Sequence, residues 1–265
     1  MDKVCFYFLS FIIYSFLGYI CEVIYVFIIT KKITNRGFLY GPLVPIYGFG
    51  AMLILGVFYP LKSIMSWYQP IIVFIVGLLL TSLLEYLASL LIELIFHIRL
   101  WDYSKHKVNI NGRVCLLNSS LFAILVLLVF YLIDPYVVSF LISSLLNLSE
   151  VLTYIVSGIL FIIFSFDFAF SLKTHIKLSL VIKYMEKAYT SIQNGVDIIK
   201  EKTEDFKDSI HDKIMDLRIM FENSKTNRLI EKASLRYPSF KVILSKSKVS
   251  FIDFITDIKR RIKGE

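Results

Sequence analysis

Long apolar runs dominate the first two thirds of the chain. The first extends from Val4 to Thr30 with Glu22 as its only charged residue, and four more cover residues 38–58, 70–96, 114–133 and 151–172. A helix needs about 20 apolar residues to cross the hydrocarbon core of a bilayer, so each run is long enough to span it. The sequence therefore predicts an all-α, polytopic membrane helix bundle of about five transmembrane helices.

Two apolar stretches need a separate interpretation. Residues 137–148 are short and follow Asp134-Pro135, which favours an interfacial or re-entrant segment over a sixth span. The first run is too long for a cleavable signal peptide, and Met1-Asp2-Lys3 is not the basic segment that precedes one. We therefore expect it to remain as an uncleaved helix.

The composition divides the chain into two predicted domains. Overall 19% of the residues are charged, against about a quarter in soluble domains. Residues 1–172 hold 9 Lys and Arg against 8 Asp and Glu, whereas residues 173–265 hold 20 against 13. We expect a transmembrane bundle over 1–172 and a cytoplasmic helical tail over 173–265. The odd number of cysteines, without metal-ligand spacing, predicts reduced thiols; they are Cys5, Cys21 and Cys115.

Positive charges in the short connections predict the orientation, because Lys and Arg are retained on the cytoplasmic side. The N-terminus and the second connection hold one Lys each, and residues 134–150 hold neither Lys nor Arg. The first and third connections are basic; their charges are Lys31, Lys32, Arg36, Arg99, Lys105, Lys107 and Arg113. We expect a multi-pass plasma-membrane protein with its N-terminus outside and its C-terminus in the cytoplasm.

Carboxylates inside the apolar runs are candidate site residues, because an ionisable group at membrane depth is costly and normally faces the bundle interior or water. They are Glu22, Glu85, Glu93 and Asp167. Glu85 is the deepest, and the step to Glu93 allows both to face one interior quadrant of the helix. A structural ion pair with a nearby arginine is the alternative for Glu22 and Glu93, and Asp167 suits the cytoplasmic boundary.

The segment from Asn35 to Gly50 combines four glycines with two prolines at the start of the second apolar run. A continuous helix is unfavourable there, and broken helices of this kind form solute and ion sites in transporters. A proline-kinked helix with glycines for close packing is the alternative. The candidate path residues of this segment are Asn35, Arg36, Gly37, Gly41, Pro42, Pro45 and Tyr47.

The third connection is short and polar. Its aromatic residues suit a membrane interface, and Asn111-Gly112 suits a tight turn. Several of its side chains are expected on the same side of the membrane as Asn35 and Arg36, where they would form a polar cytoplasmic gate. The gate candidates are Trp101, Asp102, Asn109, Asn111 and Arg113.

Blocks of these residues, spread over most of residues 7–120, resemble a known family. They are Tyr14 to Glu22, Asn35 to Gly50, Glu85-Tyr86, Trp101 to Ser104 and Asn109 to Leu116. Together they are similar to the CmpB-like bacterial integral membrane proteins described as putative ABC-transporter type IV, although Tyr19 stands where that family often has Trp. The resemblance implies a permease-like role and carries over no catalytic residue.

The tail carries an amphipathic pattern. Apolar residues fall on two heptad tracks between Tyr189 and Met220, which predicts a coiled-coil-like helix and self-association through residues 185–221. Residues 251–263 alternate apolar with basic side chains and suit a helix lying on anionic lipid. Acidic residues are interspersed throughout and no recognition motif is present, which argues against nucleic-acid binding.

The sequence offers no enzymatic motif. It contains neither G-x-x-x-x-G-K-[ST] nor G-x-S-x-G, and its four histidines are scattered. We therefore expect no enzyme, no cofactor and no metal site in this chain. The first hypothesis is a permease component of a transport system of unknown substrate, served by a separate ABC ATPase. The alternative is a membrane-anchored scaffold or sensor that recruits a cytosolic partner through its C-terminal helical tail.

Overall fold

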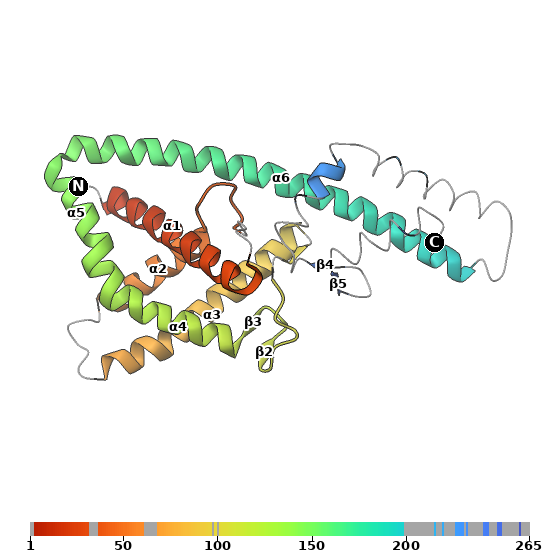
Figure 1. Ribbon diagram of the computed structural model, residues 1–265, viewed down its shortest axis with the longest axis horizontal. Helices are drawn as coiled ribbons and strands as arrows, with labels where there is room; N and C mark the ends of the chain where they lie inside the picture. Colours follow the sequence, from red (N-terminus) through yellow and green to blue (C-terminus); the bar gives the residue numbers. More distant parts are fainter. Residues whose placement is uncertain are drawn as a thin grey trace. The chain divides into compact units, whose positions relative to one another are not determined.

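The computed structural model is an all-α membrane bundle with short strands (Figure 1). It describes residues 3–31, 37–60, 68–96, 98–99, 101–198, 215, 219, 226–230, 232, 241–243, 248–250 and 260. The helices are α1 (Lys3–Thr30), α2 (Pro45–Phe58), α3 (Gln69–Phe96), α4 (Leu116–Leu128), η1 (Val129–Val138), α5 (Ser139–Leu148) and α6 (Glu150–Ile198). Two compact units result, one of Met1–Leu90 with Tyr103–Leu172 and one of Leu91–Asp102 with Lys173–Glu265.

Within the described residues, four stretches are long and apolar enough to cross a membrane: Val4–Ile28, Gln69–Phe96, Leu116–Leu148 and Glu150–Tyr184. The polytopic all-α architecture is therefore confirmed. The expected second span is shorter than predicted, because its helix α2 has 14 residues and rises only about 21 Å. Residues 37–44 are non-helical, and α2 begins at Pro45. Proline is tolerated at this first helical position because an N–H there would have no partner within the helix.

The fourth span differs from the prediction. Instead of ending near residue 133 and leaving 137–148 as a separate segment, the helix continues from Leu116 to Leu148. Pro135 lies inside the π-helical segment η1. A π-turn adds a residue to the helical turn, which accommodates a proline that lacks its N–H and crowds the preceding turn. The break predicted at Asp134-Pro135 is therefore absent, and the interfacial or re-entrant position of 137–148 stays a prediction.

Glycines permit close helix packing in the membrane unit. A Cβ on Gly18 of α1 would lie 2.3 Å from Cγ of Tyr47 on α2, and a Cβ on Gly77 of α3 would lie 2.8 Å from Cγ1 of Val126 on α4. Both separations are too short for a non-bonded contact, so each position accommodates glycine and no residue with a Cβ. Small residues at such crossings let membrane helices approach closely. Figure 1 shows the resulting group of α1, α2, α3 and α4.

The bundle part of α6 packs along α1 through aromatic rings. The Phe8 and Phe161 rings are 5.8 Å apart, and the Phe11 and Phe164 rings are 5.7 Å apart. The cysteines Cys5, Cys21 and Cys115 are free thiols.

The second unit contains a small antiparallel sheet of β1 (Ile98–Arg99), β4 (Lys241–Ile243) and β5 (Lys248–Ser250), in the order β1-β4-β5. Ile98 pairs with Val242, and Val242 pairs with Val249. The tail was expected to be helical throughout. It instead contains the strands β4 and β5, although α6 continues through Ile198. Most of the predicted heptad segment 185–221 and of the basic segment 251–263 lies outside the described residues.

Candidate functional site

A cavity of about 90 Å³ lies in the membrane unit, between α1, α2, α3 and the continuous α4–η1 helix. Its walls are mainly apolar, and three of its aromatic rings belong to Tyr14, Tyr47 and Phe122. Glu85 is the only acidic side chain among the residues that line it. A mainly apolar cavity with a few convergent polar groups is the usual form of a small-molecule site.

Glu85 is buried with half of its carboxylate unsatisfied. The residue is 5% exposed, and its Oε1 accepts a hydrogen bond of 3.0 Å from the hydroxyl of Tyr103. Its Oε2 is buried and has no hydrogen-bond partner within the described part of the chain. Leaving a buried acceptor unsatisfied costs about 1–3 kcal/mol, more for a charged group. Such a group normally indicates a functional role or a ligand.

Tyr103 is held against Glu85 by the loop that precedes the first hairpin strand. Its backbone N–H donates to the carbonyl oxygen of Gly112 at 2.8 Å. Burial, and secondly the negative charge of Glu85, raise the pKa of the Tyr103 hydroxyl well above its usual value. The hydroxyl therefore stays protonated and remains a donor to Glu85 across the physiological pH range.

A second carboxylate, Glu22 on α1, belongs to the same region. The hydroxyl of Tyr47 donates to Glu22 Oε1 at 2.9 Å, and the Tyr47 ring meets the Phe122 ring edge to face at 5.9 Å. Tyr47 lines the same cavity as Glu85. The structure thus brings together three predicted path residues, Glu22, Tyr47 and Glu85.

Asp134, a second buried carboxylate in addition to Glu85, was not among the predicted site residues. It is 3% exposed, and its Oδ1 accepts a 2.6 Å hydrogen bond from the hydroxyl of Tyr14. Its Oδ2 accepts from the hydroxyls of Tyr59 and Ser139, the latter at 3.2 Å. One sequence signal could have found it: Asp134 is the only charged residue between Arg113 and Glu150. The following proline instead suggested a loop.

Asp167 anchors the broken segment before α2. Its Oδ1 accepts from the backbone N–H of Tyr40 at 3.1 Å and its Oδ2 from that of Gly41 at 2.9 Å. A Cβ on Gly41 would lie 2.8 Å from Asp167 Oδ2, so glycine is required for this approach. The predicted path residues Gly37, Gly41, Pro42 and Pro45 therefore belong to an anchored loop and the first turn of α2, away from the cavity wall. Asn35 and Arg36 lie outside the described residues.

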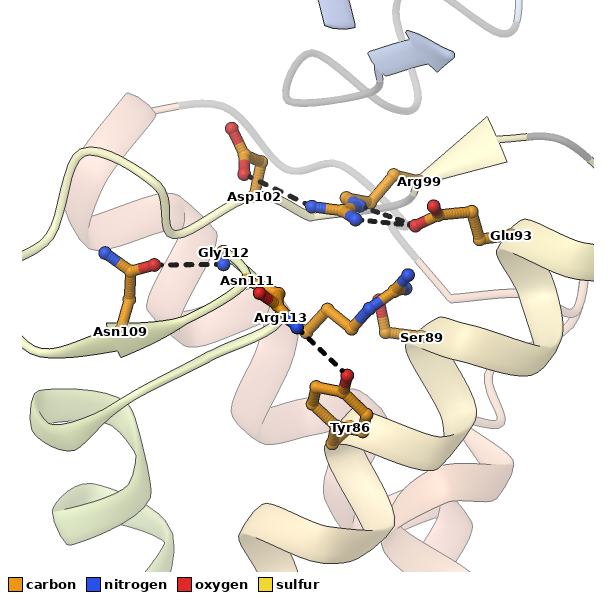
Figure 2. Close-up of polar contacts among 9 residues, drawn as sticks. All are labelled: Tyr86, Ser89, Glu93, Arg99, Asp102, Asn109, Asn111, Gly112 and Arg113. Atoms are coloured by element: carbon orange, nitrogen blue, oxygen red, sulfur yellow. Dashed lines mark hydrogen bonds and ion pairs between the residues drawn. The ribbon is translucent and has the colours of Figure 1, made fainter.

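The third connection forms a hairpin of β2 (Asn109–Ile110) and β3 (Val114–Cys115). Its turn places both Asn111 (φ 53°) and Gly112 (φ 67°) at positive φ, as a type I′ turn requires. The predicted turn at Asn111-Gly112 is confirmed. Figure 2 shows the Asn111 amide donating to the Tyr86 hydroxyl at 3.1 Å, and the Arg113 guanidinium lies 5.5 Å from the Tyr86 ring centroid.

The remaining predicted residues belong to the second unit, where Glu93, Arg99 and Asp102 form an ion-pair cluster (Figure 2). Arg99 is 1% exposed; its Nη2 lies 2.6 Å from Glu93 Oε2, and its Nη1 lies 3.7 Å from Asp102 Oδ1. This is the ion pair that sequence reasoning gave as the alternative for Glu93. Trp101 is half-buried and belongs to this unit together with Asp102. The other predicted gate residues, Asn109, Asn111 and Arg113, belong to the hairpin in the first unit. The predicted gate residues are therefore divided between the two units.

The described residues contain no group of three or more His, Cys, Asp or Glu side chains suited to hold a metal ion. What the fold does contain is a set of apolar helices of membrane-spanning length around a cavity with a buried carboxylate, which defines a multi-pass membrane protein.

Residues 9–172 match the model of the family described as "Putative ABC-transporter type IV", and the chain belongs to this family. It is accordingly a component of a membrane transport system, and the family predicted from the motif blocks is confirmed. No curated protein and no solved structure gives a significant match to the chain.

Proposed function

We propose that the chain is the permease component of its transport system and that the cavity beside Glu85 is a solute-binding chamber on the transport path. The observation that carries this proposal is the buried Glu85 carboxylate: the residue lines the cavity, and its Oε2 has no hydrogen-bond partner among the described residues. Intramembrane carboxylates that face a cavity typically mark substrate or ion pathways.

We assign ATP hydrolysis, the proposed energy source of transport, to a second protein. The chain carries no phosphate-binding G-x-x-x-x-G-K-[ST] motif, so ATP hydrolysis falls to a separate ATPase of the ABC class. Family membership supports this partner. The basic first and third connections, which the positive-inside rule assigns to the cytoplasm, are the proposed docking surface.

Purification of the tagged, full-length protein from the cells that produce it tests this proposal. Quantitative mass spectrometry in mild detergent should recover an ABC ATPase in stoichiometric amount. A variant lacking residues 184–265 is the control and should retain that ATPase. Recovery of this chain alone would contradict the ATP-driven permease. Recovery of a different cytosolic protein, lost on deletion of the tail, would support the scaffold that the sequence left as the alternative.

A further inference from the structure

Residues 105–110 form a basic loop at the start of the hairpin, in which positive charges and exposed apolar side chains stand together. The loop contains Lys105 and Lys107, both exposed, and no acidic residue. The apolar residues Val108 and Ile110 are 71% and 62% exposed. Basic and apolar side chains in this combination are typical of segments that lie on an anionic lipid surface.

Val108 holds a backbone conformation that a β-branched residue rarely adopts. Its φ is 53°, in the left-handed region that favours glycine and asparagine. Such a conformation persists only where the surrounding structure fixes it. The Val108 carbonyl accepts from the N–H of Leu116 at 3.0 Å, and the Asn109 side-chain amide donates to the carbonyl of His106 at 2.8 Å. The fold therefore keeps an exposed valine in a strained position, which points to a function for its side chain.

The same contacts place the basic loop at the membrane surface. Leu116, whose N–H bonds to the Val108 carbonyl, is the first residue of the span Leu116–Leu148. Leu116 and Leu117 are 52% and 60% exposed, as expected of side chains that face lipid. Figure 1 shows the hairpin at the N-terminal end of α4. Val108 therefore lies level with the end of a transmembrane helix, where the phospholipid headgroups are found.

We propose that the basic loop binds anionic phospholipid headgroups. Val108 and Ile110 insert into the interface, and Lys105 and Lys107 pair with the lipid phosphates. The positive-inside rule assigns this connection to the cytoplasmic side, where the leaflet carries anionic lipid. The position level with the end of the span favours lipid over a soluble protein as the occupant.

This proposal does not rest on the permease function. It leaves the first connection and the rest of the third as the docking surface for the proposed ATPase. Loss of lipid binding and loss of the ATPase would therefore be separate results.

Tryptophan fluorescence of the full-length protein in lipid nanodiscs tests the proposal. Ile110→Trp introduces a reporter at an exposed position, and the emission of wild type, which holds Trp67 and Trp101, is subtracted. Phosphatidylcholine nanodiscs receive a small, equal fraction of either brominated phosphatidylglycerol or brominated phosphatidylcholine, because bromine quenches tryptophan on contact. A lysine near an anionic surface strengthens the attraction about fivefold. We expect both lipids to quench the reporter, with the phosphatidylglycerol preferred about fivefold or more.

Two pairs of lysines provide the matched comparison in the Ile110→Trp protein. Lys105→Gln with Lys107→Gln should reduce the preference for phosphatidylglycerol to less than about twofold. Quenching by brominated phosphatidylcholine should persist, because the apolar side chains remain. Lys173→Gln with Lys177→Gln removes two exposed lysines outside the loop and should leave the preference unchanged.

A measurement on wild type keeps the test independent of how the variants fold. A photoreactive phosphatidylglycerol in the nanodiscs should label residues 105–110, as located by mass spectrometry of the digested protein. Labelling confined to other segments, equal quenching by the two brominated lipids, or an unchanged preference without the two loop lysines would each overturn the proposal. A reporter quenched by aqueous iodide and by neither lipid would do so too. A photo-crosslinker at position 110 that captures an ABC ATPase in cells would instead assign the loop to that protein and overturn the lipid site.

Discussion

Glu85 and Asp134 are both buried carboxylates of the same membrane unit, yet their surroundings differ. Asp134 is 3% exposed and receives hydroxyl groups on both oxygens, from Tyr14, Tyr59 and Ser139. Glu85 is 5% exposed and receives one hydroxyl on one oxygen. Burial alone therefore does not distinguish the two carboxylates. The unsatisfied hydrogen bond does, because a buried acceptor without a donor is a cost that a ligand can remove.

The two carboxylates also sit in different local structures. Asp134 lies in the π-helical segment η1 and ties it to α1 through Tyr14 and to the residue after α2 through Tyr59. Glu85 lies in the regular helix α3 and lines the cavity. On this comparison Asp134 stabilises the helix packing, whereas Glu85 keeps one acceptor oxygen without a donor among the described residues.

The largest expected effect follows from removing Asp134. In Asp134→Ala three hydroxyl donors lose a charged acceptor, which should lower the free energy of unfolding by about 3 kcal/mol or more. Glu85→Ala should cost less than about 1 kcal/mol, because that carboxylate has a single bond and an open oxygen. Unfolding in mixed micelles by increasing SDS measures both. Equal losses in the two variants would refute the distinction.

A smaller loss should follow from Tyr14→Phe, which removes one hydrogen bond to Asp134 and leaves the ring in place. A bond to a charged group contributes about 1.5–3 kcal/mol, and the unfolding midpoint should fall accordingly. A Tyr14→Phe protein as stable as wild type would show that Asp134 is not a structural anchor.

On the Glu85 side, Gly18→Ala should disturb the cavity through Tyr47. The new Cβ would lie 2.4 Å from the Tyr47 Cβ, so the helices must separate, and overpacking of this kind costs about 1–3 kcal/mol. Gly56→Ala is the matched control in α2, since nothing lies within 4 Å of its added Cβ. Thermal unfolding of both variants checks this prediction. A Gly18→Ala protein as stable as Gly56→Ala would contradict the close packing of Gly18 against Tyr47.

The smallest effect concerns alkaline pH. The pKa of Tyr103 is raised in the folded protein above its ordinary value of 10.0, so the folded state holds this proton more tightly than the unfolded state. That contribution is complete well below pH 10 and is lost as the pH rises through and beyond 10, by about 1.4 kcal/mol at pH 11. Wild type should therefore lose more stability than Tyr103→Phe between pH 9 and pH 11. Parallel pH profiles of the unfolding midpoint for wild type and Tyr103→Phe would contradict this prediction.

Much of the fold was predictable because bilayer insertion selects on local hydropathy. The runs over 4–30, 70–96 and 151–172 became parts of α1, α3 and α6, and the Gly/Pro segment interrupted the helix before α2 as expected. The Asn111-Gly112 turn also followed from residue type, since positive φ at two successive positions demands such residues. The continuous helix through Pro135 did not follow, because a local reading of Asp134-Pro135 favours a break.

For the site, hydropathy and residue type specified the components: several apolar spans and a few carboxylates that are too costly to place in lipid. The role of each carboxylate depends on the tertiary structure. It pairs Asp134 with Tyr14, 120 residues away in the chain, joins Glu93 to Arg99, and leaves Glu85 Oε2 without a hydrogen-bond partner among the described residues. The physical reason is that hydrogen bonding in a membrane bundle depends on helix rotation and close packing between distant segments, which no local pattern of residues specifies.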